Sequence, residues 1–258
     1  MDPGYVALAL VCGALVGLAL GTVGGGGSIL TVPILIYLLG EGVHRATGTA
    51  LAIVGVNALI AAWPHARAGR VRLPVALTVG AMGIVGAVAG TWLGGLAPAR
   101  AILIGFAALM LVAAVAMVRL RPPVRVGAAP PVGFSPRVAA VGLAVGVLTG
   151  FFGVGGGFLI VPALVLALGL PMREAVGTSL VVIAINAAAA LTGRLSANEV
   201  DLAVTVLFIV GGALGSAFGG RLAGRLDERR LRQGFAGMVV LVALYILTRT
   251  LLGHGAGA

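Results

Sequence analysis

The sequence GTVGGGGSILTVP occupies residues 21–33, and the related sequence GFFGVGGGFLIVP occupies residues 150–162. The two stretches are 129 residues apart, and each joins a cluster of glycines to a short apolar run that contains a proline. Clustered glycines weaken a helix, because each costs about 1 kcal/mol relative to alanine. Each stretch therefore predicts a break in the chain followed by a new, short helix.

The similarity extends on both sides of these stretches. Between residues 13–57 and 142–186, 18 of 45 positions are identical without a gap, where this biased composition gives roughly an eighth by chance. The chain is therefore a duplication. We expect a first repeat over 1–119, a cytoplasmic linker over 120–136 that is rich in proline and arginine, and a second repeat over 137–258.

The composition places the chain in a membrane. Hydrophobic residues make up 60% of the 258 residues and charged residues only 9%, which is too few charges to cover a water-facing surface. The net charge of +10 comes from arginines gathered between apolar runs, a pattern that suits lipid headgroups rather than nucleic acid. Cys12 is the single cysteine, which excludes an internal disulfide and any multi-cysteine metal site.

Each half reads as five apolar segments, so we expect an all-α polytopic membrane protein of two five-segment inverted repeats. The segments 28–40 and 157–169 have 13 residues, about 20 Å of helix, whereas the hydrocarbon core is about 30 Å thick. They form short, glycine-interrupted hairpins with the segments before them. The hairpins either span or re-enter, which gives about 8–10 transmembrane segments. The other segments are 5–20, 44–64, 73–95, 100–119, 136–150, 173–193, 200–220 and 230–250.

The arginines predict the orientation. With both termini outside, thirteen arginines lie on the cytoplasmic side and four outside, as the positive-inside rule requires. The four outside are Arg45, Arg100, Arg194 and Arg249. An odd number of crossings in each half would invert the second repeat relative to the first. From the apolar segments and the arginine distribution together, we expect a multi-pass protein of a bacterial or archaeal inner membrane.

The glycine clusters are the first candidate binding site. A glycine run before a helix start presents unpaired backbone N–H groups and the positive end of the helix dipole, which together receive anions. Short, interrupted segments at matching positions of two repeats also mark substrate sites in transporters. The alternative is that the glycines only allow close helix packing. The candidates are Gly24, Gly25, Gly26, Gly27, Ser28, Gly153, Gly155, Gly156 and Gly157.

The segment after each glycine cluster supplies polar candidates. Asn57 and Asn186 occupy matching positions well inside a span, where an unpaired amide is expensive and therefore marks a site or an interhelical hydrogen bond. Both alternatives stay open. Thr49, Thr178 and Ser179 lie near the start of these segments and can contact substrate or bond to their own helix.

The duplicated glycine motif resembles the sulfite exporter TauE/SafE family, also called the toluenesulfonate uptake permease family. The resemblance lies in Gly24–Pro33 with Ala46–Thr49 and in Gly153–Pro162 with Ala175–Thr178. It implies a permease for sulfite, sulfonates or related sulfur or carboxylate anions. In the first half Gly25 and Ser28 replace the Val154 and Gly157 of the second, which makes the two loops unequal.

These observations favour a secondary transporter, and an exporter in particular, of small sulfur-containing anions such as sulfite, sulfonates or sulfoacetate. The anion would lie near mid-membrane between the two glycine loops. One alternative is an accessory subunit that binds a partner membrane protein. A membrane-embedded enzyme is less favoured, because the sequence has no HExxH or GxSxG motif. We expect a small anion and the lipid bilayer as partners, no nucleic acid, no metal or other cofactor, and a sequence compatible with a homo-oligomer.

Overall fold

The computed structural model describes residues 2–25, 27–119, 134–152, 157–195 and 200–251, and every regular element among them is helical. This confirms the all-α polytopic fold. The first half contains α1 (Pro3–Val23), α2 (Gly27–Tyr37), α3 (Val43–Arg67), α4 (Leu73–Gly94) and α5 (Ala99–Arg119). The second contains α6 (Pro136–Phe152), α7 (Gly157–Pro162), the π-helical turn η1 (Ala163–Ala167), α8 (Met172–Leu195), α9 (Leu202–Arg225) and α10 (Glu228–Leu251).

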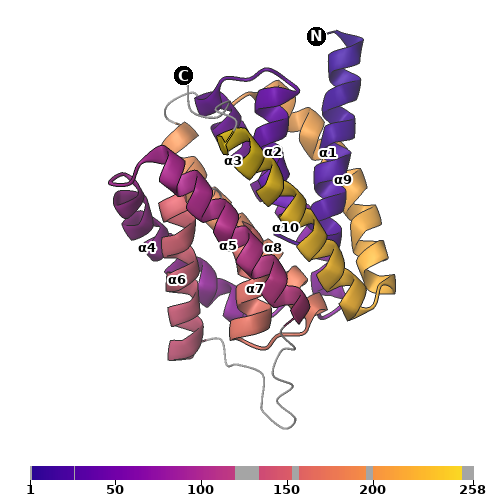
Figure 1. Cartoon of the computed structure of the whole chain (residues 1–258). Coiled ribbons are helices and arrows are strands. Elements are labelled where there is room, and N and C mark those ends of the chain that lie inside the picture. The colour runs from indigo at the N-terminus through magenta and orange to yellow at the C-terminus, as the bar shows by residue number, and fades with distance from the viewer. Residues whose placement is uncertain (1, 26, 120–133, 153–156, 196–199, 252–258) are drawn as a thin grey trace.

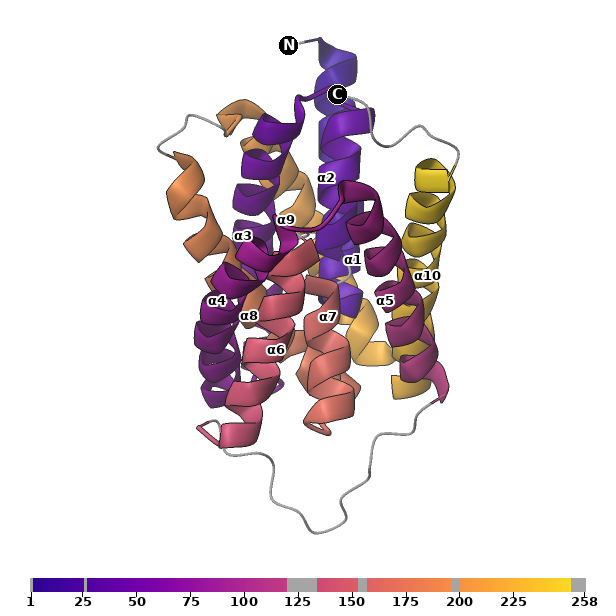
Figure 2. The same cartoon turned by 60° about the vertical axis from the view of Figure 1, so that its left-hand side comes forward.

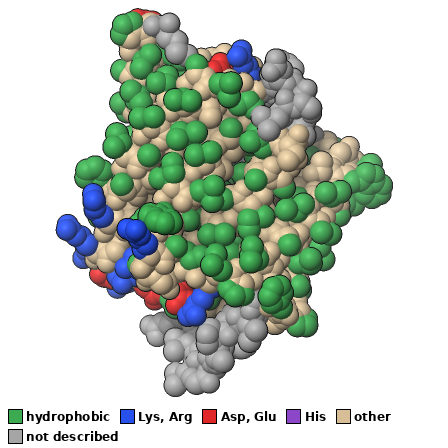
Figure 3. All heavy atoms as spheres, turned by 180° about the vertical axis from the view of Figure 1, so that it is seen from behind, with side chains coloured by type: hydrophobic (Ala, Val, Ile, Leu, Met, Phe, Trp, Pro, Cys, Tyr) green, Lys and Arg blue, Asp and Glu red, His purple; other side chains and the backbone are tan. Residues whose placement is uncertain are grey.

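Seven of the described helices, α1, α3, α4, α5, α8, α9 and α10, are long and apolar enough to cross a membrane. The segments after the two glycine clusters are shorter: α2 has 11 residues, and α7 with η1 covers Gly157–Ala167. Large apolar side chains such as Trp92 and Val88, both 70% exposed, cover the outside of the bundle. Figure 3 shows apolar side chains over the middle of one face, with most of the visible charges gathered at one end.

The helices run up and down between two ends of the molecule. Helix α1 begins and α10 ends at one end, which we call the terminal end, whereas α5 ends and α6 begins at the opposite end (Figures 1 and 2). The rings of Tyr37, the last residue of α2, and Tyr245 of α10 lie 6.3 Å apart, so α2 also ends near the terminal end.

The closest helix pairs cross between the halves. Helix α1 packs along α9, and α6 packs along α4, which are exchanged partners under the 129-residue offset. A Cβ at Gly13 or Gly21 would lie 2.6–2.8 Å from main-chain atoms of Phe208 or Ser216 on α9. A Cβ at Gly142 would lie 2.8 Å from the Val79 Cα on α4. These glycines are therefore required for the close approach of the helices.

This exchanged packing is compatible with an inverted repeat. The inversion of the second half stays a prediction, as does the division into repeats at 1–119 and 137–258. The helices α1–α5 fall within the first repeat as drawn, and α6 begins at Pro136, one residue before the second. Most of the linker 120–136 lies outside the described residues.

Candidate functional site

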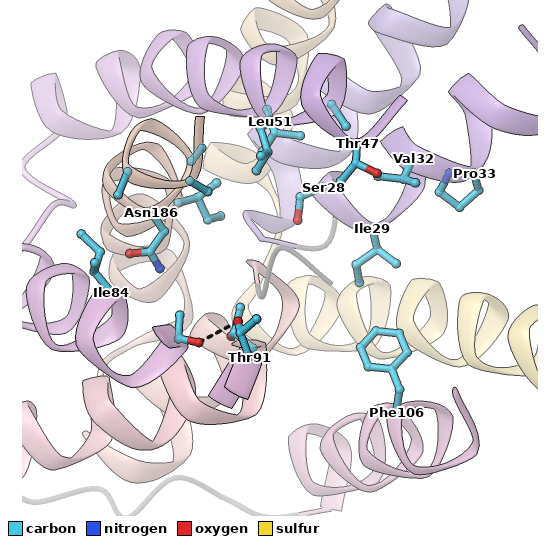
Figure 4. Close-up of a pocket in the computed structure, with 18 of the residues that line it drawn as sticks. Ser28, Ile29, Val32, Pro33, Thr47, Leu51, Ile84, Thr91, Phe106 and Asn186 are labelled. Atoms are coloured by element: carbon cyan, nitrogen blue, oxygen red, sulfur yellow. Dashed lines mark hydrogen bonds between the residues drawn. The ribbon is translucent and has the colours of Figure 1, made fainter. Parts of the chain in front are cut away.

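A cavity of about 450 Å³ lies between the two halves (Figure 4), in the part of the bundle nearer the terminal end. Its walls come from α2, α3, α4, α5, α6, α8 and α10. Thr91 lies near the last turn of α4, Leu103 near the first turn of α5 and Ile246 near the end of α10, which places the cavity in this half of the bundle. A volume of this size is within the range of small-molecule sites.

The cavity wall is mostly apolar, and among the described residues it carries no charged side chain. Its polar side chains are Ser28, Thr47, Thr91, Thr149 and Asn186. The hydroxyls of Thr91 and Thr149 donate to main-chain oxygens of their own helices, Ala87 at 2.8 Å and Val145 at 2.7 Å. The hydroxyls of Thr91 and Thr149 are thus occupied within their own helices. Asn186 and the first turn of α2 supply further polar groups to the wall.

The start of α2 faces the cavity. Ser28 and Ile29, in its first turn, both line the wall, and the Ser28 hydroxyl donates to the Gly25 oxygen at 2.7 Å. Gly24 has φ +75°, a conformation that favours glycine and turns the chain from α1 into α2. Val32 and Pro33 line the wall as well, so one face of α2 borders the cavity from its first turn onward.

The two glycine clusters come together behind Ser28. A Cβ on Gly157 would lie 2.8 Å from the Gly25 oxygen, and a Cβ on Gly25 would overlap the Gly157 main chain. Gly27 lies against α1 instead, where a Cβ on Gly27 would be 2.7–2.8 Å from atoms of Leu20 and Val16. The candidates Gly26, Gly153, Gly155 and Gly156 lie outside the described residues.

The paired asparagines lie in different surroundings. Asn186 lines the cavity, and its Oδ1 is buried with no hydrogen-bond partner among the described residues (Figure 4). Asn57 is fully buried away from the cavity, and its Nδ2 donates to the Phe208 oxygen at 3.3 Å. The Oδ1 of Asn57 is likewise buried without a partner among the described residues, so a role of either asparagine in substrate binding stays a prediction.

Three candidates with hydroxyl groups, Thr49, Thr178 and Ser179, lie outside the cavity wall, unlike Ser28. Thr49 and Thr178 are fully buried, and each accepts a main-chain N–H from the other half: from Asp201 at 2.9 Å and from Arg72 at 3.1 Å, respectively. Ser179 donates to the Val176 oxygen at 2.8 Å. Each thus has a bond within the protein, and a role of these three residues in substrate binding stays a prediction.

Two of the ion pairs among the described residues join the first half to the second. Near the start of α3, Arg45 lies 3.0 Å from Asp201, the N-cap of α9. Just before α4, Arg72 pairs with Glu174 through two hydrogen bonds of 2.8 and 3.1 Å, which raise the pKa of Arg72. Neither pair lines the cavity.

Sequence reasoning missed several residues of this region. Thr91, Thr149, Ile84 and Phe106 line the cavity but carry no motif that could have indicated them. His65 is 2% exposed, and its Nε2 lies 3.2 Å from the Gly21 oxygen of α1. Among the described residues, no three His, Cys, Asp or Glu side chains gather as a metal site.

Comparison with known proteins also indicates a membrane transporter. The family model described as "Sulfite exporter TauE/SafE" matches residues 9–246. A Xylella fastidiosa (strain Temecula1) protein named "Probable membrane transporter protein" is 36% identical over 248 residues, covering 92% of this chain and 93% of its own. The "Probable membrane transporter protein YdhB" of Bacillus subtilis is 28% identical over 243 residues, covering 93% and 95%. No solved structure matches the chain.

Proposed function

This chain belongs to the sulfite exporter TauE/SafE family of membrane transporters, and from that premise we propose that it exports small sulfur-containing anions. The substrate class includes sulfite, sulfonates and sulfoacetate. The observation that supports a site for them is the cavity between the halves, which the N-terminal turn of α2 faces through Ser28 and Ile29.

The electrostatics of the cavity favour an anion over a cation. The N–H groups of the first helical turn have no intrahelical partner, and the helix dipole adds a partial positive charge at this end. Because no carboxylate lines the described wall, nothing there repels a negative charge. The Asn186 amide can turn its NH2 toward an anion, since oxygen and nitrogen of an amide exchange places by a flip.

The driving force for export needs no additional device. A membrane potential of about 100 mV, negative inside, favours the outward movement of each negative charge by about 2.3 kcal/mol. In the orientation with both termini outside, the cavity described above lies in the outer half of the bundle.

The orientation has a direct test in intact cells. Starting from Cys12→Ala, which removes the single cysteine, Leu96→Cys and Ala68→Cys place thiols in the α4–α5 and α3–α4 connections, where both residues are exposed. We expect an impermeant maleimide to label the Leu96→Cys protein in intact bacterial cells. The Ala68→Cys protein should react only after permeabilisation, and the reverse pattern would overturn the orientation.

The substrate proposal is tested by ligand-dependent thermal stability of the purified protein. The panel contains sulfite, sulfoacetate, taurine, thiosulfate, sulfate and acetate. An anion at a hundred times its Kd stabilises the folded state by about 2.7 kcal/mol. We expect a sulfur anion to raise the apparent Tm, with the stabilisation about halved in Asn186→Ala and kept in Asn57→Ala. A folded protein that responds to none of these anions would instead favour an accessory membrane subunit.

A further inference from the structure

The two ion pairs that join the halves carry opposite polarity at matching positions. Arg45 of the first half corresponds to Glu174 of the second under the 129-residue offset, and Arg72 corresponds to Asp201. Arg45 pairs with Asp201, and Glu174 pairs with Arg72, so each bridge crosses between the halves. Since α3 begins at the terminal end and runs to the opposite end, we call the first the outer bridge and the second the inner bridge.

A threonine at the matching position of each half supports each bridge. Thr49 and Thr178 are counterparts, and each accepts the main-chain N–H of the bridge residue that precedes a helix: Asp201 before α9 and Arg72 before α4. Both bridges are thus built on one local plan. The plan allows the outer and inner bridges to be compared position by position.

The comparison reveals one carboxyl group in excess at the outer bridge. Glu41, in the connection between α2 and α3, has the apolar Leu170 as its counterpart at the inner bridge. Among the described side chains, the outer cluster of Glu41, Arg45 and Asp201 therefore has two carboxyls for one guanidinium. The inner pair is charge-balanced, with two hydrogen bonds between Arg72 and Glu174.

Glu41 is poorly placed to hold a negative charge. Its Oε2 is buried and has no hydrogen-bond partner among the described residues, while Arg45 pairs with Asp201. Burial raises the pKa of the Glu41 carboxyl and the charge of Asp201 raises it further, whereas Arg45 and the Thr49 side chain act in the opposite direction. The titratable and charged groups that face it among the described side chains are Tyr5 of α1, Arg45 of α3 and Asp201 at the start of α9.

We propose that Glu41, Arg45 and Asp201 form a proton-binding site that links the transport cycle to pH on the side of the chain termini. When Glu41 carries a proton, Arg45 pairs with Asp201 alone, and the outer bridge holds the halves together. When Glu41 releases the proton, its carboxylate competes for Arg45 and the bridge loosens. The proposal rests on the proposed transport function, because it assigns the proton as the ion that controls the outer side of that site.

Proton binding is tested without any substrate, by infrared difference spectra of the purified protein between about pH 4 and about pH 8. We expect a protonated-carboxyl band that titrates above the ordinary glutamic acid value of about 4.3. The band should be lost in Glu41→Gln and kept in Glu174→Gln, the matched change at the inner bridge. Asp201→Asn should shift the titration to lower pH, because it removes the neighbouring negative charge. An unchanged band in Glu41→Gln, or no shift in Asp201→Asn, would overturn the proposal.

The link to transport is tested in proteoliposomes with sulfite as the probe. We expect sulfite flux in the native protein to depend on the pH at the side of the chain termini, and this dependence to be lost in Glu41→Gln. A pH-dependent flux that is identical in native and Glu41→Gln protein would contradict the link. Absence of sulfite flux in every variant would count against the proposed substrate alone, since the infrared result is independent of it.

Discussion

The side-chain amide of Asn57 on α3 donates to the main-chain oxygen of Phe208 on α9 at 3.3 Å, beside Gly212. We expect Asn57→Ala to lower the free energy of unfolding by about 1 kcal/mol, the usual value of an interhelical hydrogen bond in a membrane protein. The apparent Tm of the purified protein measures this loss. A loss of anion binding without any loss of stability would contradict the structural role.

Asn186→Ala should have the opposite consequences. Its Oδ1 has no partner among the described residues, so the substitution removes no such bond and should leave the Tm of the ligand-free protein nearly unchanged. The Kd of the best-bound anion should rise about tenfold, which corresponds to about 1.4 kcal/mol. Titration calorimetry of both asparagine variants with that anion makes the comparison. Equal affinities in the two variants would remove Asn186 from the site.

The close approach of α1 and α9 predicts a large effect of one methyl group. In Gly17→Ala the new Cβ would overlap the Gly212 main chain, and such overpacking costs about 1–3 kcal/mol. Gly237→Ala on α10 is the matched control, because a Cβ there meets nothing within 4 Å. Apparent Tm values should fall in the first variant and stay level or rise in the second. Equal values would refute the packing role of Gly17.

The inner bridge should contribute modestly, because the Arg72 side chain is 42% exposed. A double-mutant cycle with Arg72→Ala and Glu174→Ala isolates the pair, and we expect a coupling energy of about 0.2–1 kcal/mol. Unfolding in mixed micelles of rising denaturing detergent supplies the four stabilities. Additive losses would show that the two groups do not act together.

The raised pKa of Glu41 predicts how stability depends on pH. A carboxyl with a raised pKa in the folded state contributes stability that is fully present below the ordinary value of about 4.3 and is lost as pH rises through the folded pKa. The apparent Tm of the native protein should therefore fall over this window. Glu41→Gln resembles the protonated form, so it should remove this part of the fall. A profile parallel to that of the native protein would contradict the assignment.

The fold was predictable because its determinants repeat along the chain. The sparse charge, the apolar segments and the glycine clusters predict an all-helical membrane bundle, and α2 and α7 begin at Gly27 and Gly157, where the glycines predict a start. The packing of α1 on α9 was hidden, because it depends on which helix of one half meets which helix of the other.

The site was predictable only in part. Identical residue types at matching positions, such as Asn57 and Asn186, meet different neighbours because α9 covers one and the cavity exposes the other. Thr49 and Thr178 bond to main-chain groups that lie more than 100 residues away in sequence. The apolar cavity wall uses residues such as Ile84 that resemble every other core position.

The reversed polarity of the two bridges bears on the history of the duplication. If two copies of the first half were placed as the two halves now lie, Arg45 would face Arg72, and two copies of the second half would set Glu174 against Asp201. Like charges at that separation repel. The charges therefore make the two halves complementary at these positions, and a half-length ancestor that paired with itself would have set like charges against each other here unless it carried different residues.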